Sequence, residues 1–214
     1  MRRIFLQSLL LPIFLLGTSA FSSAFADEQN RTLPAFKSIK SRSAFNLLVE
    51  VGKTQSIQIR GNEKFLASVT TEVYGDELVI SYKEKNSVKV SDNAQVIITV
   101  PELVRFKMEG AGKTTLNNIS GTHFTLLYEG AGMLTVNGKV KSFTLKAQGV
   151  GLVEAKDLIA EQVDASVEGV GAVSVNARDN LNASVQGIGT LTYYGRPRNV
   201  SKSVEGIGSV RAAD

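Results

Sequence analysis

A short glycine signature recurs six times down the second half of the chain and constrains its fold more than any other feature. Each copy has Glu or Gln, then glycine, one apolar residue and a second glycine. The first glycines of the copies are Gly110, Gly130, Gly149, Gly169, Gly187 and Gly206. Successive copies are therefore 20, 19, 20, 18 and 19 residues apart. A near-constant interval of this length predicts one small structural unit stacked on itself.

The residues around each signature alternate between apolar and polar, as they do in β-strands. Apolar residues stand two before, four after and six after the first glycine. In the third copy these are Ala147, Val153 and Ala155, with Glu154 between the last two. A period of two places the apolar set in a core and the polar set on a wetted face. Residues 106–214 are therefore predicted to form a six-coil β-solenoid, with equivalent residues about 4.8 Å apart along the stack.

The first 26 residues have the pattern of a secretory signal peptide. A basic start at Arg2 and Arg3 precedes an apolar stretch, and Ala24-Phe25-Ala26 supplies a small-x-small cleavage site. This pattern predicts export, to the periplasm or the cell surface. Residues 27–35 are polar and are expected to form a flexible lead. No later segment offers about twenty apolar residues, so no membrane span is expected after signal removal.

Residues 36–105 are β-like but do not repeat. Five strands are predicted, at 45–51, 55–60, 65–74, 77–82 and 95–100. Gly75-Asp76 is a turn signal between two of them and predicts a hairpin. A solenoid whose first coil were open would expose a sheet edge that invites aggregation. This region is therefore predicted to be an N-terminal β-strand cap that also begins the solenoid core.

Three elements together resemble the bacterial putative auto-transporter adhesin, head GIN domain family. They are Val100-Pro101-Glu102-Leu103 at the end of the strand-rich half, the glycine repeats, and the segment from Leu191 to Pro197 before the last repeat. The resemblance implies an all-β, right-handed parallel β-helix-like solenoid, export to the cell envelope and an adhesin role. It brings no catalytic residues. One departure is that the family usually has Ser-Gly-Ser-Gly, whereas this chain has Glu or Gln first and Ala, Val or Ile between the glycines.

The residues that precede the first glycines are predicted to stack into a ladder, which is the tentative ligand or cation site. They are Glu109, Glu129, Gln148, Glu168, Gln186 and Glu205. Carboxylates stacked this closely repel unless they are screened or bridged, so the ladder could bind a cation or a polar glycan face, with the first two rungs best suited to an ion. The favoured alternative is a solvated ladder satisfied by its own amides and by nearby lysines. No metal, cofactor or catalytic residue is assigned.

The residues between the two glycines have two possible orientations. They are Ala111, Ala131, Val150, Val170, Ile188 and Ile207. Simple alternation would point them outward as an apolar stripe, and such stripes mark interfaces, so the last four form a possible self-association surface. If each glycine kinks the chain, they enter the core instead. The inward orientation is the favoured prediction.

Composition narrows the function classes. The chain has 24 Lys and Arg against 20 Asp and Glu, without a basic stripe, and no cysteine, which argues against nucleic acid as a partner and excludes disulfides. We predict a non-catalytic, exported cell-envelope protein with an adhesin-like binding or structural role, whose partner is an envelope protein, a glycan or a second copy. The alternative is a polysaccharide lyase or hydrolase on a β-helix scaffold, although the acidic residues follow the repeat and do not cluster.

Overall fold

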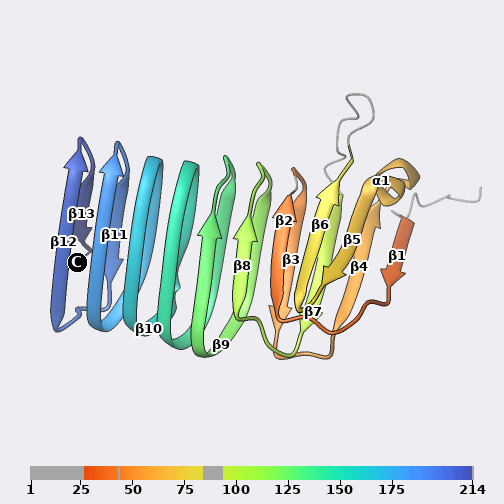
Figure 1. Ribbon diagram of the computed structural model, residues 1–214, viewed down its shortest axis with the longest axis horizontal. Coiled ribbons are helices and arrows are strands. Elements are labelled where there is room, and N and C mark those ends of the chain that lie inside the picture. Colours follow the sequence, from red (N-terminus) through yellow and green to blue (C-terminus); the bar gives the residue numbers. More distant parts are fainter. Residues whose placement is uncertain (1–26, 43, 84–93, 214) are drawn as a thin grey trace, which may run out of the picture.

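The protein is almost entirely β-strand, as predicted. The computed structural model describes residues 27–42, 44–83 and 94–213. Within these residues, thirteen strands form one mixed sheet that curls on itself, and one short helix lies at its N-terminal end (Figure 1). The predicted signal peptide, residues 1–26, lies outside the described residues.

The N-terminal half contributes eight strands and the helix. They are β1 (Asp27–Arg31), β2 (Ser38–Arg42), β3 (Asn46–Val51), β4 (Ser56–Gly61), α1 (Glu63–Ser68), β5 (Val69–Tyr74), β6 (Glu77–Tyr82), β7 (Gln95–Val100) and β8 (Arg105–Met108). Antiparallel pairs join β1 to β4, β4 to β7 and β5 to β6. The predicted hairpin at Gly75-Asp76 is confirmed, because it is the turn between β5 and β6.

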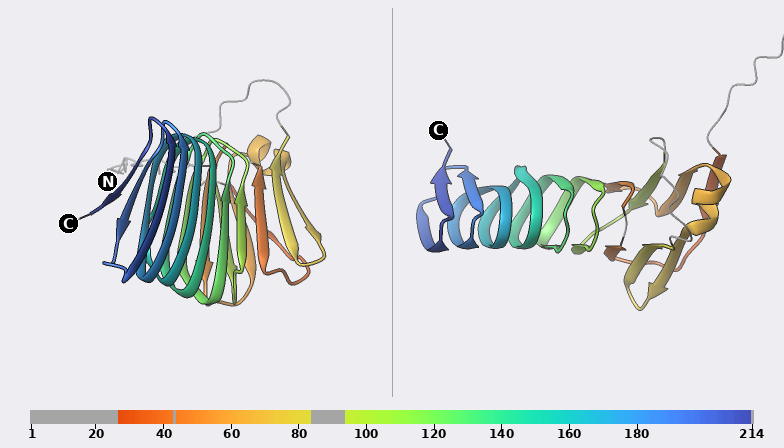
Figure 2. Two further views of the ribbon diagram at one scale, coloured as in Figure 1. Left: turned by 60° about the vertical axis from the view of Figure 1, so that its left-hand side comes forward. Right: turned by 90° about the horizontal axis from the view of Figure 1, so that it is seen from above.

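The glycine repeats fold as stacked turns of chain. Their strands are β9 (Lys113–Tyr128), β10 (Met133–Gly187), β11 (Thr190–Tyr194), β12 (Asn199–Gly206) and β13 (Ser209–Ala212). β10 is long because ladder hydrogen bonding continues around the corners of several turns. Seen from above in Figure 2, these turns form a rod, with the β5–β6 hairpin and α1 at its far end.

Successive copies of the repeat pair in parallel and in register. Leu134 lies beside Thr114 and Val136 beside Leu116, one copy apart. The same one-copy offset joins β10 to β11 and β12, and β11 to β13. The N-terminal half continues this stack, because β3 pairs in parallel with β9, and β2 with β8. Equivalent side chains therefore lie in columns along the rod, as the sequence predicted.

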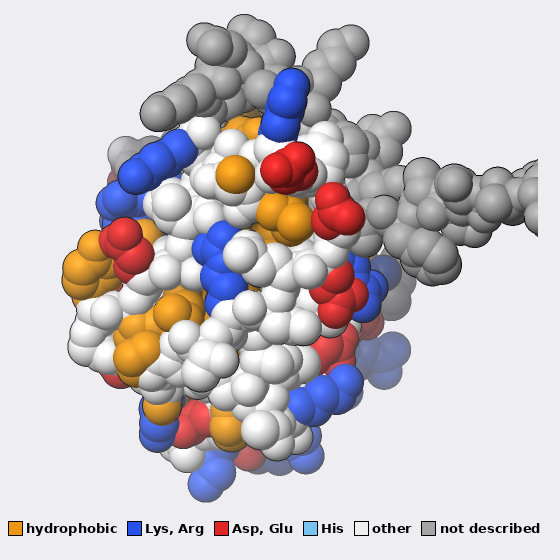
Figure 3. All heavy atoms as spheres, turned by 90° about the vertical axis from the view of Figure 1, so that its right-hand side faces the viewer, with side chains coloured by type: hydrophobic (Ala, Val, Ile, Leu, Met, Phe, Trp, Pro, Cys, Tyr) orange, Lys and Arg blue, Asp and Glu red, His pale blue; other side chains and the backbone are white. Residues whose placement is uncertain are grey.

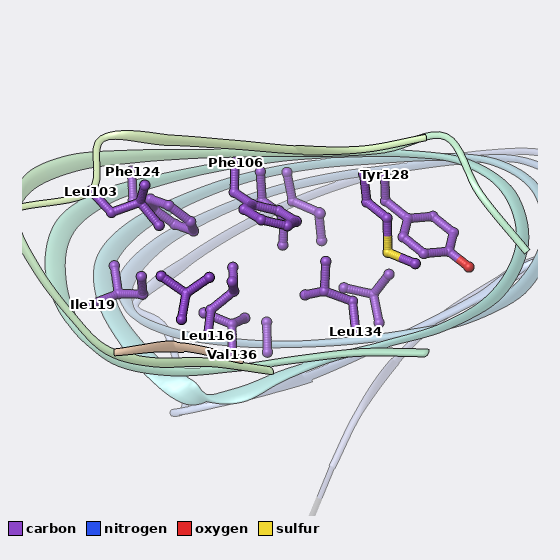
Figure 4. Close-up of a cluster of buried hydrophobic side chains, with 14 of the residues drawn as sticks. Leu103, Phe106, Leu116, Ile119, Phe124, Tyr128, Leu134 and Val136 are labelled. Carbon is purple, nitrogen blue, oxygen red and sulfur yellow. The ribbon is translucent and has the colours of Figure 1, made fainter. Parts of the chain in front are cut away.

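The columns of apolar residues fill the interior of a flattened coil. Figure 4 looks along the stack, with Leu103, Ile119 and Phe124 at one narrow end and Tyr128 at the other. The rings of Phe124 and Phe143 stack with their centroids 6.0 Å apart. One buried cluster runs from the cap through the repeats, so cap and coils share a single core.

The cap differs from the prediction in two places. The strand predicted over 65–74 begins as α1, because the Asn62 side chain accepts a hydrogen bond from the Phe65 backbone N–H at 2.8 Å and caps the helix. Phe65 is buried there against the rings of Phe45 and Tyr82. The lead predicted as flexible contains β1, which is held by pairing with β4 and by Arg31, whose guanidinium donates to Thr71 and to the Leu66 carbonyl.

The two ends of the rod are finished differently. Figure 3 faces the capped end, where acidic and basic side chains are interspersed with smaller hydrophobic areas. At the other end the predicted core column reaches solvent: Val204 is 44% exposed, and none of the described residues forms a further coil over it. The ammonium of Lys202 lies 4.7 Å from the centroid of the Tyr193 ring, so a cation–π contact shields part of this last coil.

Candidate functional site

The glycine signature forms one corner of each coil, and backbone contact between corners explains the glycines. The Ala131 N–H donates to the Gly110 carbonyl at 3.0 Å, and the Val150 N–H donates to the Gly130 carbonyl at the same distance. A Cβ added at Gly132 would lie 2.1 Å from the Gly112 carbonyl oxygen one coil earlier. The corner therefore stacks backbone on backbone with no room for a side chain.

Tyr128 supports this corner from inside the coil. Its ring lies inside the coil (Figure 4), and its hydroxyl donates to the Gly132 carbonyl at 2.7 Å. Burial raises the pKa of Tyr128, which keeps the phenol protonated and able to donate.

The residues of the predicted ladder lie within reach of one another in successive coils, and the N-terminal end of their row is a compact ion cluster. Glu109 contacts Lys40 at 2.9 Å, Arg42 at 2.8 Å and Lys107 at 2.8 Å. Lys107 also contacts Glu129 at 2.9 Å, so its ammonium lies between the first two carboxylates. That is the place a bound cation would need. This geometry favours the alternative in which lysines satisfy the ladder.

The cluster lowers the pKa of Glu109. Burial works to raise its pKa, but hydrogen bonds from Lys107, Lys40 and Arg42 outweigh burial and hold the pKa at about 2. The same contacts raise the pKa of Lys107, chiefly through its hydrogen bonds to Glu109 and Glu129. Glu109 and Lys107 therefore both stay charged over the physiological pH range.

This ion cluster predicts a loss of stability in acid. The folded-state pKa of Glu109, about 2, lies below its ordinary value of 4.5, so its contribution is complete above pH 4.5 and disappears as the pH falls towards 2. After allowance for solvent screening, we expect about 1–2 kcal/mol. Urea unfolding at stepped pH should show the wild type and Glu109→Gln differing by this amount at pH 7 and converging by pH 2.

The exposed pair of Lys37 and Glu102 supplies a matched control for this experiment. Its atoms are 2.7 Å apart, but both side chains are largely in solvent. Glu102→Gln should change the free energy of unfolding by less than about 1 kcal/mol at pH 7. A gap between wild type and Glu109→Gln that persisted unchanged to pH 2 would contradict the assignment.

The remaining rungs of the ladder are satisfied by amides. The Gln148 side chain donates to Glu168 at 2.6 Å, and the Gln186 side chain donates to Glu205 at 3.2 Å. The hydrogen bond from Gln148, with help from Lys146, lowers the pKa of Glu168. Within residues 27–42, 44–83 and 94–213, no group of three or more His, Cys, Asp and Glu is placed to hold a metal ion.

The stripe between the glycines points outward, so the favoured inward orientation is wrong. Val150 is 59% exposed, Val170 47%, Ile188 60% and Ile207 84%, and the two alanines are also exposed. The glycines do not kink these residues into the core, because the close backbone stacking of the corners leaves no interior space beside them. The chain thus presents an unbroken apolar row along one edge of the rod.

A polar groove, which sequence reasoning missed, lies on the same wall as the ladder, towards the opposite corner. Its volume is about 710 Å³ and it is open to solvent. Its polar lining comes from four successive coils: Ser142, Thr144, Gln162, Asp164, Asn180, Asn182, Arg198, Asn199 and Ser201. The available signal was the recurrence of two outward polar residues, two residues apart, in four successive copies: Ser142 and Thr144, Gln162 and Asp164, Asn180 and Asn182, and Asn199 and Ser201.

Hydrogen bonds between coils hold the groove side chains in place. The Asn182 amide donates to Asp164 at 3.3 Å, and the Asn199 amide donates to Asn180 at 2.9 Å. Arg198 is anchored by Asp179 at 3.5 Å. Each bonded side chain keeps further donors or acceptors for a ligand. The result is an ordered array of amides, hydroxyls and one carboxylate.

Comparison with protein families matches residues 35–197 to the family described as "Putative auto-transporter adhesin, head GIN domain". The chain belongs to this family. The resemblance drawn from the repeats and their flanking segments is thereby confirmed. No curated protein matches the chain.

Solved structures similar to this head GIN domain are known. A putative adhesin from Bacteroides fragilis NCTC 9343 is 25% identical, with a TM-score of 0.73 over 89% of this chain and 98% of that one. A putative lipid binding protein from Parabacteroides distasonis ATCC 8503 is 20% identical, with a TM-score of 0.50 over 90% and 98%. A putative adhesin from the same strain is 16% identical, with a TM-score of 0.50 over 87% and 96%. The last two share the fold alone.

The family membership agrees with an adhesin-like protein. Across the parts of this head GIN domain that the structure describes, no helix is long and apolar enough to cross a membrane.

Proposed function

We propose that this head GIN domain is a non-catalytic, exported binding module of the cell envelope that holds a glycan in its polar groove. The proposal includes the finer architecture, a right-handed parallel β-helix-like solenoid with an N-terminal β-strand cap. Export rests on the signal-like residues 1–26 and places the protein in the periplasm or at the cell surface. A second element of the proposal is self-association through the outward apolar stripe.

The groove is the observation that carries the glycan proposal. Most small-molecule sites are enclosed and apolar, whereas this one is open and lined mainly by polar side chains from four coils, with Val163, Leu181 and Val200 between them. Sugar hydroxyls both donate and accept hydrogen bonds, so they are matched by the side chains of Asn, Gln, Ser and Thr. An open groove that crosses successive coils suits a linear chain of sugars better than a compact metabolite.

The same lining supports binding without turnover. Glycoside hydrolysis uses two carboxyl groups on either side of the scissile bond. The groove lining contains one, Asp164, and it already accepts a hydrogen bond from Asn182. The ladder carboxylates nearest the cap are engaged by Lys107, Lys40 and Arg42. The groove and the ladder therefore support a lyase or hydrolase less well than a binding protein.

A polysaccharide array tests the proposal. We expect the purified protein to bind at least one immobilised neutral or acidic bacterial polysaccharide without releasing fragments. Asn180→Ala combined with Asn182→Ala removes two groove amides at about 1 kcal/mol each, and should weaken binding at least about tenfold.

A matched pair of asparagines outside the groove controls for folding effects. Asn117 and Asn137 bond to each other across two coils at 2.6 Å, so Asn117→Ala with Asn137→Ala also removes a coil-to-coil amide contact. This control should bind as the wild type does. The proposal fails if no polysaccharide binds, or if both pairs of substitutions weaken binding equally. Depolymerised product would instead favour the enzyme.

A further inference from the structure

The apolar stripe is a straight, evenly spaced row. Its rungs are tied to the preceding corner by backbone hydrogen bonds: the Ile188 N–H donates to the Gly169 carbonyl at 3.1 Å, and the Ile207 N–H donates to the Gly187 carbonyl at 3.0 Å. The spacing between rungs is that of parallel strands, about 4.8 Å. A second row with this spacing can lie along it in register over its whole length.

Side-chain size along the stripe follows a gradient. The order from cap to open end is Ala111, Ala131, Val150, Val170, Ile188 and Ile207. Two identical stripes running in the same direction would pair Ala with Ala and Ile with Ile, so the rods would touch at one end and gape at the other. Running in opposite directions, every pair has nearly the same total size: Ala with Ile twice, and Val with Val.

We propose that a second copy of this chain packs on the stripe in antiparallel orientation, about a two-fold axis that passes between Val150 and Val170. The interface is isologous, as in most homodimers. The inference rests on the self-association proposed above and is independent of glycan binding, because the stripe residues do not line the groove.

The rows that flank the stripe fit the same arrangement. A two-fold axis perpendicular to the rod places each flanking row opposite itself in reverse order. Gln148 then faces Glu168 of the second copy, and Glu129 faces Gln186, so amides oppose carboxylates at four of the six rungs. The end pairs oppose Glu109 to Glu205, and Glu109 is already neutralised by its three cationic neighbours.

The flanking row on the other side also combines large with small side chains. Met133, which is 40% exposed, would face Thr190 of the second copy, and Leu152 would face Ala172. In the same-direction arrangement, each of these residues would instead meet the Glu and Gln ladder. Size and polarity therefore favour the antiparallel dimer on both sides of the stripe.

The contact involves only one edge of a short rod, so we expect it to bury less than about 1,200 Å² of surface in total, which is small for a protein–protein interface. We therefore expect a reversible dimer with a dissociation constant on the order of micromolar or weaker. Sedimentation velocity over a concentration series should show mass rising from monomer to dimer.

Ile188→Ser with Ile207→Ser should weaken dimerisation at least about tenfold. Tyr74→Ser changes an exposed aromatic side chain away from the stripe and should leave dimerisation unchanged.

Cysteine cross-linking tests the orientation, since the native chain has no cysteine. Ala131→Cys and Ile188→Cys proteins are prepared separately and mixed under mild oxidation. The antiparallel arrangement predicts the mixed disulfide dimer, because a disulfide requires Cβ atoms about 3.5–4.5 Å apart. Dominant homodimers of either protein would overturn the antiparallel orientation.

Exchanging the large and small side chains of one facing pair offers a second test, which needs no cross-linking. Ala131→Ile alone places two large residues opposite each other and should weaken dimerisation, and adding Ile188→Ala should restore it. Failure of the double variant to recover would overturn the pairing. A wild-type protein that stays monomeric at millimolar concentration would overturn the dimer, while glycan binding by the groove would be unaffected.

Discussion

Replacing Gly171 with alanine is expected to lower the free energy of unfolding by about 3 kcal/mol or more. The added Cβ would lie 2.3 Å from the Gly151 carbonyl oxygen, and both atoms belong to stacked backbone that cannot move without breaking the corner contacts. Strain here should spread to neighbouring coils, since each corner sits directly on the one before. Urea unfolding followed by circular dichroism measures the change.

Gly75 in the β5–β6 turn is the matched control. It has a φ of +62°, and a Cβ there would meet nothing within 4 Å. Asparagine tolerates this left-handed conformation, so Gly75→Asn should cost less than about 1 kcal/mol. Equal costs at the two positions would mean that the corners do not stack as closely as the structure shows.

Phe143→Ala is expected to cost about 3–5 kcal/mol. The Phe143 ring is fully buried and stacks on Phe124 of the preceding coil with an angle of 11° between the ring planes. Removing it leaves a cavity between two rigid walls, and a coil tied on both sides by ladder hydrogen bonds cannot collapse to fill it. The same urea unfolding experiment measures the loss.

Phe143→Leu keeps most of the apolar volume and should cost about 1.5 kcal/mol or less. A cost for Phe143→Ala no larger than that for Phe143→Leu would show that the cavity closes by collapse. The stacked ring pair would then contribute little to holding adjacent coils together.

The repeat pattern was enough to predict that successive copies in the second half stack in parallel and in register. The constant interval between glycine signatures and the two-residue period of the apolar positions predict that equivalent residues of successive copies stack in parallel. The pairing of Leu134 with Thr114 confirms this stacking. The cap was harder, because it has no repeat. The sequence predicts a strand from Phe65, but the chain forms α1 there because Asn62 caps the helix.

The candidate site was predictable in its rows but not in its contacts. The ladder follows directly from the interval between glycines. The ion cluster at its N-terminal end could not be predicted in this way, because Lys40 and Arg42 reach Glu109 from β2. Arg42 and Glu109 are 67 residues apart in the sequence. The groove was missed for a related reason, because a hollow on the surface depends on how four coils sit against one another.

By itself, the sequence determined an all-β stack of glycine-cornered coils, its family and the columns of residues that run along it. Those properties depend on the local periodicity of the repeats, which each copy of the signature and its neighbours contains. The tertiary structure alone decided that the Ala, Val and Ile row faces solvent, that Lys107 lies between the first two ladder carboxylates, and where the groove lies. Each of these depends on how closely neighbouring backbones approach, a distance that no single segment of sequence encodes.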